Sequence, residues 1–141
     1  MRLLVALIVS ILPSVALAEL HEVEMLNRDE TGSMVYAPSY LKIAPGDTVK
    51  FLATRPGHNA ASIDGMVPGG AEPFKGKINE EIEVTFTVPG IYGIKCTPHY
   101  AMGMVMLIQV GDGPATPDTL PDDLPKRAKD RLLSYISAQP Q

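Results

Sequence analysis

The sequence predicts an all-β domain, built as an antiparallel sandwich or barrel of short strands and followed by a C-terminal helical extension. Residues 82–88 (IEVTFTV) alternate strictly between apolar and polar side chains, as expected for a half-buried strand. Turns rich in Pro and Gly separate this strand from its neighbours, which is typical of antiparallel β-proteins. After residue 111 the composition changes to a Pro-rich connector and an amphipathic segment, which predicts the extension.

The other predicted strands are apolar segments that end at turn signals. They are Glu22–Leu26, Met34–Ile43, Thr48–Ala53, Gly90–Cys96 and Met104–Val110. Pro45-Gly46-Asp47 and Pro89-Gly90 are typical turn sequences. Residues 53–79 instead form a long excursion with little periodicity and four clusters of Pro or Gly. Irregular loops of this length usually have a functional reason, so this segment is a place to look for site residues.

The C-terminal extension is predicted to hold two helices that pack on the same domain. A short helical turn is expected around residues 116–120, and a longer helix from Pro125 with Asp122 or Asp123 near its cap. One stripe of the longer helix is apolar, which indicates that it docks on the sandwich. The stripe consists of Leu124, Ala128, Leu132, Tyr135 and Ile136. We therefore expect the sandwich over residues 19–111 and the extension over residues 112–141.

The N-terminus has the pattern of a secretory signal peptide over residues 1–18. Arg2 supplies a positive start, a short apolar run follows, and Ala16-Leu17-Ala18 is a typical cleavage site, which predicts cleavage after Ala18. An uncleaved membrane anchor is the alternative, but the run is short for a bilayer. No other apolar run has membrane-spanning length. The sequence thus predicts an exported domain without stable membrane insertion.

Charge and cysteine content narrow the function further. Without Arg2, 11 Lys and Arg residues oppose 16 Asp and Glu residues, a formal charge of −5. Nucleic acid is excluded as a partner because phosphate binding needs a basic surface. The chain has one cysteine, Cys96, which cannot pair within the chain. An unpaired cysteine in an exported protein indicates an intermolecular bridge, a reactive thiol or a metal bond.

The segment CTPHYAMGM, residues 96–104, gathers potential metal ligands in one short loop. Cys96, His99 and Met104 have the spacing Cys-x2-His-x4-Met, which lets a tight loop between strands direct all three side chains at one point. A fourth ligand is still needed. His58 in the long excursion can supply it, provided that the two loops meet at one end of the sandwich. Asn59, next to it, could then tie the two loops together.

One thiolate, two imidazoles and a thioether favour copper over zinc. Structural zinc prefers four strong ligands, and a thioether is a poor one. Two His and a Cys with a weak axial Met is the ligand set of a blue-copper electron-transfer site. Taken singly, each residue has an ordinary explanation: His58 as a solvated surface residue, Cys96 as a small buried one. Met102, Met104 and Met106 would be core fillers. It is the joint pattern that predicts one copper ion.

These segments resemble the pseudoazurins, small cupredoxins of the bacterial periplasm. The resemblance covers the predicted mature chain and includes EVEMLN, PGHNA, CTPHYAMGM and the helical C-terminus. It implies an all-β, cupredoxin-like Greek-key β-sandwich of eight strands with a C-terminal α-helical extension of two helices. It further implies His58, Cys96, His99 and Met104 as the copper ligands, with Met102 off the metal. Asn59 and Pro98 are expected beside the ligands.

The resemblance also implies a function and partners. It predicts a monomeric periplasmic carrier that donates electrons to copper nitrite reductase or a related denitrification enzyme, with a cytochrome as donor. Lys75, Lys77 and Lys95 are expected to form a positive rim that steers an acidic partner to the edge of His99, and Arg28 and Arg55 are candidates to join it. The alternative for these charges is an ordinary solvated mixture.

Two other functions remain as alternatives to the carrier. An enzyme would need an orienting group and oxyanion donors around the Cys and His, and nothing in the sequence marks them. A copper oxidase would need further His-rich sites, and the chain has three His. A periplasmic copper-binding or chaperone protein without an electron-transfer role stays open, but chaperones favour exposed, exchangeable sites.

Overall fold

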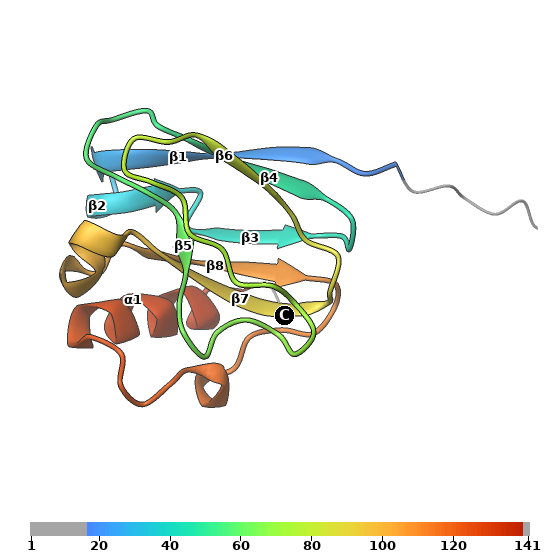
Figure 1. Ribbon diagram of the computed structural model, residues 1–141. Helices are drawn as coiled ribbons and strands as arrows, with labels where there is room; N and C mark the ends of the chain where they lie inside the picture. Colours follow the sequence, from blue (N-terminus) through green and yellow to red (C-terminus); the bar gives the residue numbers. More distant parts are fainter. Residues whose placement is uncertain (1–16, 140–141) are drawn as a thin grey trace, which may run out of the picture.

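Two four-stranded sheets face each other in the computed structural model, which describes residues 17–139 (Figure 1). The first sheet has the order β2-β1-β4-β6 and the second the order β3-β8-β7-β5. The strands are β1 (Leu20–Asp29), β2 (Gly32–Ala37), β3 (Tyr40–Ile43), β4 (Thr48–Leu52), β5 (Ala61–Ser62), β6 (Ile82–Thr85), β7 (Gly90–Lys95) and β8 (Val105–Val110). The all-β sandwich prediction is confirmed.

The strand predictions were wrong in three details. Both sheets are mixed, because β1 pairs in parallel with β4 and β3 with β8. Residues 34–43 do not form one strand: β2 and β3 belong to different sheets, and the chain crosses between them at Pro38, which has no N–H to donate to a ladder. The strand β5, a two-residue strand that pairs with β7, was not predicted, because its residues lie in the irregular excursion.

β8 is buried on both faces because it lies between two hydrophobic cores. Met106, Ile108 and Val110 pack into the core between the sheets. Val105 and Leu107, which point the other way, pack into a second core beneath the C-terminal extension. Side chains alternate across a strand, so one strand can serve both cores. This explains why VMLIQV is almost continuously apolar rather than alternating.

The extension consists of one 3-10 turn, η2 (Pro117–Thr119), and one α-helix, α1 (Lys126–Ser137). The apolar stripe of α1 was predicted correctly: Ala128 and Leu132 are fully buried in the second core. The cap prediction was wrong. Pro125 occupies the N-cap position without a side-chain cap, because Leu124 is anchored in the core directly before it and keeps the aspartates outside the first turn.

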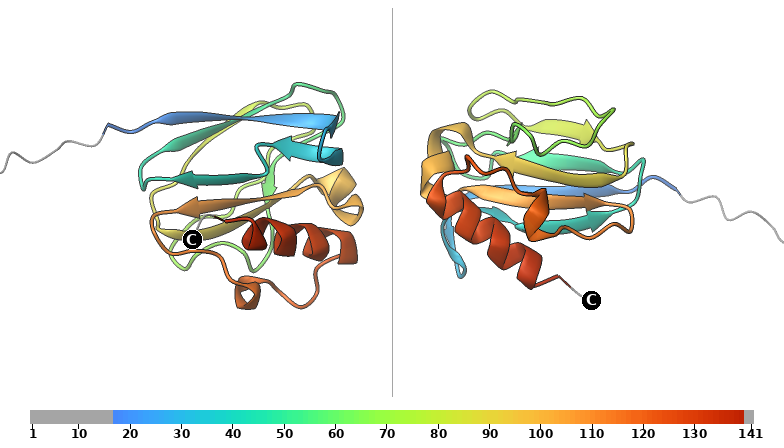
Figure 2. Two further views of the ribbon diagram at one scale, coloured as in Figure 1. Left: turned by 180° about the vertical axis from the view of Figure 1, so that it is seen from behind. Right: turned by 90° about the horizontal axis from the view of Figure 1, so that it is seen from below.

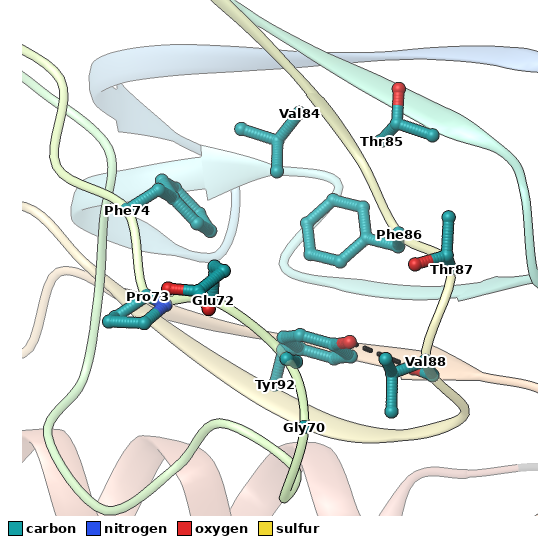
Figure 3. A pocket seen from close by; sticks show the side chains of 11 residues that line it. Gly70, Glu72, Pro73, Phe74, Val84, Thr85, Phe86, Thr87, Val88 and Tyr92 are labelled. Carbon is teal, nitrogen blue, oxygen red and sulfur yellow. Dashed lines mark hydrogen bonds between the residues drawn. The ribbon is translucent and has the colours of Figure 1, made fainter.

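The long excursion covers the open side of the sandwich between β5 and β6. Its Phe74 contacts the rings of Phe51 and Phe86, with centroids 6.0 and 6.2 Å apart. Phe86 in turn packs edge-on against Tyr92 at 4.9 Å. A hollow of about 320 Å³ remains beside these rings, and Figure 3 shows Phe74, Phe86 and Tyr92 around it. Its lining holds no His or Cys, so it is separate from the predicted ligands.

The predicted signal peptide lies mostly in residues 1–16, outside the described part of the chain, so the peptide and its cleavage site stay predictions. Within residues 17–139, no helix has both the length and the apolar character needed to cross a membrane.

A buried carboxylate, Asp47, ties the start of β1 to the turn before β4. It accepts hydrogen bonds from the backbone N–H groups of Glu19 at 2.9 Å and Ala44 at 3.0 Å, and from the ring of His21 at 3.0 Å. The hydrogen bond from Glu19 and then that from His21 hold the pKa of Asp47 below its ordinary value. The charged form therefore stabilises the fold above the pKa of the unfolded chain, and this contribution is lost as the pH falls through the lower folded value.

We expect Asp47→Asn to lower the free energy of unfolding by about 1–3 kcal/mol at pH 7, because donors buried around the carboxylate lose their acceptor. The difference from the unmutated protein should shrink once the pH falls below the ordinary aspartate pKa of about 4, where the unfolded chain takes up the proton first, and it should vanish only below the lower pKa of the folded state. Urea denaturation at both pH values measures this. Asp112→Asn, at an exposed carboxylate 3.3 Å from Lys42, is the control and should have little effect; equal losses from the two variants would contradict the assignment.

Candidate metal centre

Three of the predicted ligands meet at one end of the sandwich. The Nδ1 atoms of His58 and His99 are 3.1 Å apart, and Sγ of Cys96 lies 3.6 and 3.5 Å from them. These atoms form a nearly equilateral triangle whose centre is about 2 Å from each corner, close to the bond length of a metal to nitrogen or sulfur. The geometry therefore suits one metal ion bound by all three side chains.

The loop that carries Cys96 and His99 is closed by its own backbone. It consists of the 3-10 turn η1 (Thr97–Met102) and Gly103, between β7 and β8. The N–H of His99 donates to the carbonyl of Cys96, and the N–H of Met104 donates to the carbonyl of His99, both at 3.1 Å. The N–H of Cys96 donates to the carbonyl of Met104 at 3.0 Å. The spacing of Cys, His and Met thus corresponds to one hydrogen-bonded turn.

Met104 and Met102 differ sharply within this loop. Met104 is fully buried and belongs to the same core cluster as Cys96, whereas the side chain of Met102 is 41 % exposed. Of these two methionines, Met104 is therefore the one placed to act as a ligand with the three converging donors.

His58 is oriented by a residue that the sequence analysis did not single out. Its Nε2 lies 2.7 Å from Oδ1 of Asn27 in β1, and its backbone carbonyl accepts from Asn79 N–H at 2.8 Å. An amide oxygen can only accept, so Nε2 donates and the lone pair of a neutral ring is left on Nδ1. Asn27 is 31 residues away in sequence, and no spacing pattern could have linked it to His58.

Asn59 joins the two ligand loops. Its Oδ1 accepts from the N–H of Thr97 at 2.7 Å, and its Nδ2 donates to Oγ1 of Thr97 at 3.0 Å and to the carbonyl of Gly76 at 2.9 Å. Its own carbonyl accepts from the hydroxyl of Tyr36 at 2.7 Å. Pro98 lies at the exposed start of η1 and contributes no donor to this network.

Burial favours the neutral forms of the buried donor groups. It lowers the pKa of His58, and the neighbouring His99 lowers it further. Burial also raises the pKa of the Cys96 thiol, although the backbone N–H groups of Asn59 and His99 act in the opposite direction by favouring the thiolate. A metal that binds here would meet a neutral imidazole on His58 and release a proton from the thiol.

The donor set fits copper by its chemistry. One thiolate and two imidazoles with a buried thioether nearby match a blue-copper site, whereas a thioether is a poor ligand for zinc. His58 is 1 % exposed, which excludes its role as a solvated surface residue. The site lies just beneath the surface, because His99 is partly exposed and is surrounded by exposed residues. These are Thr97, Pro98, Ala101 and Met102.

The three predicted docking lysines have different environments. Lys75 and Lys77 are exposed. Lys95 is only 19 % exposed at its side chain, lies over the ring of Tyr100 and has Asp64 3.8 Å from its ammonium. Lys75 and Lys95 line one hollow together with Thr97, the residue after Cys96. The positive charges thus lie beside the metal end, but that of Lys95 is partly offset.

Comparison with known proteins agrees with this geometry. The model of the family "copper binding proteins, plastocyanin/azurin family" matches residues 23–111. Pseudoazurin from Paracoccus pantotrophus is 46 % identical over 121 residues, which are 85 % of this chain and 83 % of that one. A putative pseudoazurin from Rhizobium leguminosarum bv. viciae is 47 % identical over 124 residues, 84 % of this chain and 82 % of the relative. The solved pseudoazurin from Hyphomicrobium denitrificans superimposes with a TM-score of 0.78 at 41 % identity, covering 86 % of this chain and 99 % of that one.

We expect Cys96→Ser to abolish the intense visible absorption of the copper-loaded protein, because that absorption requires a thiolate bound to the metal. Serine is smaller than cysteine and leaves the sandwich folded. Visible absorption after addition of Cu(II), with far-UV circular dichroism as the check on folding, tests both statements. An intense visible band in the serine variant would show that the thiol is not a ligand.

Proposed function

The chain belongs to the pseudoazurins, copper electron carriers within the plastocyanin/azurin family, and on that premise we propose that it carries single electrons between redox proteins of the bacterial periplasm. Pseudoazurins are carriers and not enzymes, and the cofactor is copper. The observation that supports the proposal best is the convergence of two imidazole nitrogens and one thiol within 3.1–3.6 Å, just below an exposed surface.

In this proposal, Nδ1 of His58, Sγ of Cys96 and Nδ1 of His99 would hold the metal, and the thioether of Met104 would be the weaker fourth ligand. Copper bound there supplies a Cu(II)/Cu(I) couple. The residues of the chain keep the donor atoms in place in both oxidation states: Asn27 orients His58, and the loop from Cys96 to Met104 is closed by its own hydrogen bonds. Donors that move little keep the reorganisation on electron transfer small.

The exposed surface around His99 is the proposed exit for the electron. Apolar Pro98, Ala101 and Met102 can exclude water from a contact, and His99 connects that contact to the metal. Lys75 and Lys77 add positive charge beside it, which would steer an acidic partner. As implied by the family, we propose copper nitrite reductase or a related denitrification enzyme as acceptor and a cytochrome as donor, with the carrier acting as a monomer.

The structure argues against a copper chaperone. Chaperones exchange their metal, whereas here His58 and Cys96 are buried and the ligand loop is locked by its own backbone. Stopped-flow mixing of the reduced, copper-loaded protein with purified copper nitrite reductase separates the two functions. A carrier regains its blue band as the reductase is reduced, while its copper content stays constant. Loss of copper from the protein without reduction of the partner would support the chaperone instead.

Met104 and Met102 should respond differently to the same substitution. Met104→Gln replaces a weak axial sulfur with a harder oxygen, which stabilises Cu(II) and lowers the reduction potential. Met102→Gln is the matched control and should change the potential much less, because its side chain is exposed. Spectroelectrochemical titration of both variants measures this; equal shifts would remove the case for Met104 as a ligand.

Charge reversal at Lys75 and Lys77 should slow electron transfer to an acidic reductase without changing the visible spectrum. Exposed charges act on encounter, so the slowing should fade as the salt concentration rises and the Debye length falls below about 10 Å. Bimolecular rates of Lys75→Glu/Lys77→Glu over a range of salt concentrations measure the effect. The single variants Lys75→Glu and Lys77→Glu are measured as well, and Lys42→Glu, at the opposite end of the sandwich, is their control with the same change in net charge. Rates indifferent to mutation and salt would leave an apolar contact around His99 as the docking surface.

A further inference from the structure

We propose that Arg131, on the C-terminal helix, is a positioning residue of the metal centre: it fixes the end of the ligand loop that carries Met104 and thereby helps to set the reduction potential. This inference rests on the assignment of Met104 as axial ligand in the proposed function.

The guanidinium of Arg131 bonds backbone carbonyls of two separate segments. Nη1 donates to the carbonyls of Met34 at 2.7 Å and Gly103 at 2.8 Å, and Nη2 donates to the carbonyl of Ser33 at 2.7 Å. Gly103 is the residue directly before Met104. Bonds from a charged donor are stronger than neutral ones, and the planar fork of arginine fixes their directions. One side chain therefore holds the loop end against β2.

The helix itself approaches the loop so closely that a side chain in place of Gly103 would crowd its backbone. Gly103 has a left-handed backbone with φ of 86°, and a Cβ there would lie 3.0 Å from the carbonyl oxygen of Arg127. Both views of Figure 2 show the start of α1 next to η1. The first turn of α1 thus supports the backbone of the ligand loop, one turn before Arg131.

The carbonyls of Ser33 and Met34 connect Arg131 to β2, the strand that pairs with the strand carrying Asn27. Met34 has a positive φ of 52°, a conformation that costs energy for a residue other than glycine and persists only where its surroundings hold it. β2 pairs with β1 in a register that places Leu26 opposite Val35 and Arg28 opposite Ser33. Asn27, which orients His58, lies between these pairs. Arg131 therefore connects the backbone that carries the weak ligand with the strand that orients a strong one.

A weak axial ligand is the one that the protein scaffold can tune. The thiolate and imidazoles bind strongly and set their own distances, whereas a thioether binds weakly, at a distance that the scaffold imposes. The axial interaction affects the two oxidation states of copper unequally, so a displacement of Met104 changes the potential. Release of the Gly103 carbonyl should therefore alter the axial interaction more than the plane of strong ligands.

A purely structural role, in which Arg131 only anchors the helix, makes a different prediction. Leu132 is fully buried in the second core, against which Tyr100 of the ligand loop also packs, but it makes none of the three hydrogen bonds of Arg131. Leu132→Ala loosens the helix without removing the three hydrogen bonds of Arg131. Arg127→Met makes the same chemical change as Arg131→Met, one turn earlier on the same helix, at an exposed side chain. The two variants are the controls.

The test compares Arg131→Met with these controls in the full chain. In the copper-loaded protein we measure the reduction potential and the ratio of the visible absorption bands, and in the metal-free protein the hydrogen exchange of the Met104 amide. Arg131→Met should shift the potential and the band ratio and speed the exchange by about tenfold, because the loop opens locally. Arg127→Met should leave all three unchanged. Leu132→Ala should lower stability but keep the band ratio.

Wild-type values in Arg131→Met would overturn the inference, and so would an equal shift in Leu132→Ala. If Arg131→Met does not fold, Arg131→Lys is measured in the same way, since an ammonium keeps the charge but lacks the fork that reaches three carbonyls. A wild-type protein that shows no blue band with copper would contradict the proposed function instead. The exchange measurement on the metal-free protein would still decide whether Arg131 holds the loop.

Discussion

The metal centre depends on one constraint: the fold must hold three metal-binding side chains close together even without a metal ion. Two imidazole nitrogens and a thiol lie within 3.1–3.6 Å of one another in a buried position, where polar groups are costly unless they are bonded. The surrounding hydrogen bonds offset this cost. Asn27 takes the proton-bearing nitrogen of His58, and Asn59 fastens the loop of His58 to the loop of Cys96. His58 keeps the lone pair of Nδ1 directed inward because its other ring nitrogen is bonded to Asn27.

The strand β8 links this centre to the rest of the fold. It begins directly after Met104 and sends alternate side chains into the two cores, so the sandwich and the extension both fix the position of the ligand loop. The family model for the copper-binding domain ends at residue 111, before the extension. The extension nevertheless reaches the metal end, where Arg131 bonds the carbonyl of Gly103. In this chain the extension therefore supports the ligand loop as well as covering apolar surface.

The chemistry of the site could be predicted from the sequence because much of it is local. Cys96, His99 and Met104 belong to one turn, and their spacing is the spacing of its hydrogen bonds. His58 was identified because few histidines were available and its loop was irregular. The supporting contacts could not be predicted, since Asn27 lies 31 residues from His58 and Arg131 lies 97 residues from Met34. Such pairs meet only through the topology of the fold.

The fold predictions failed where a local pattern had two physical solutions. A run of strand-forming residues can continue in one sheet or cross to the other, and residues 34–43 cross at Pro38. An aspartate before a helix can cap it or stay in solvent, and burial of Leu124 decides against capping here.

Charge shows the same limit. A net charge of −4 predicts nothing about one face, because a local field depends on where each charge stands: Lys75 and Lys77 are exposed, and so are Glu72 and Glu80 close to them in the sequence. Lys95 contributes less to this field than its position in the sequence suggests, since the carboxylate of Asp64 lies 3.8 Å from its ammonium. The proposed recognition of an acidic partner therefore depends on where a few charges stand relative to His99, and only the folded chain determines that.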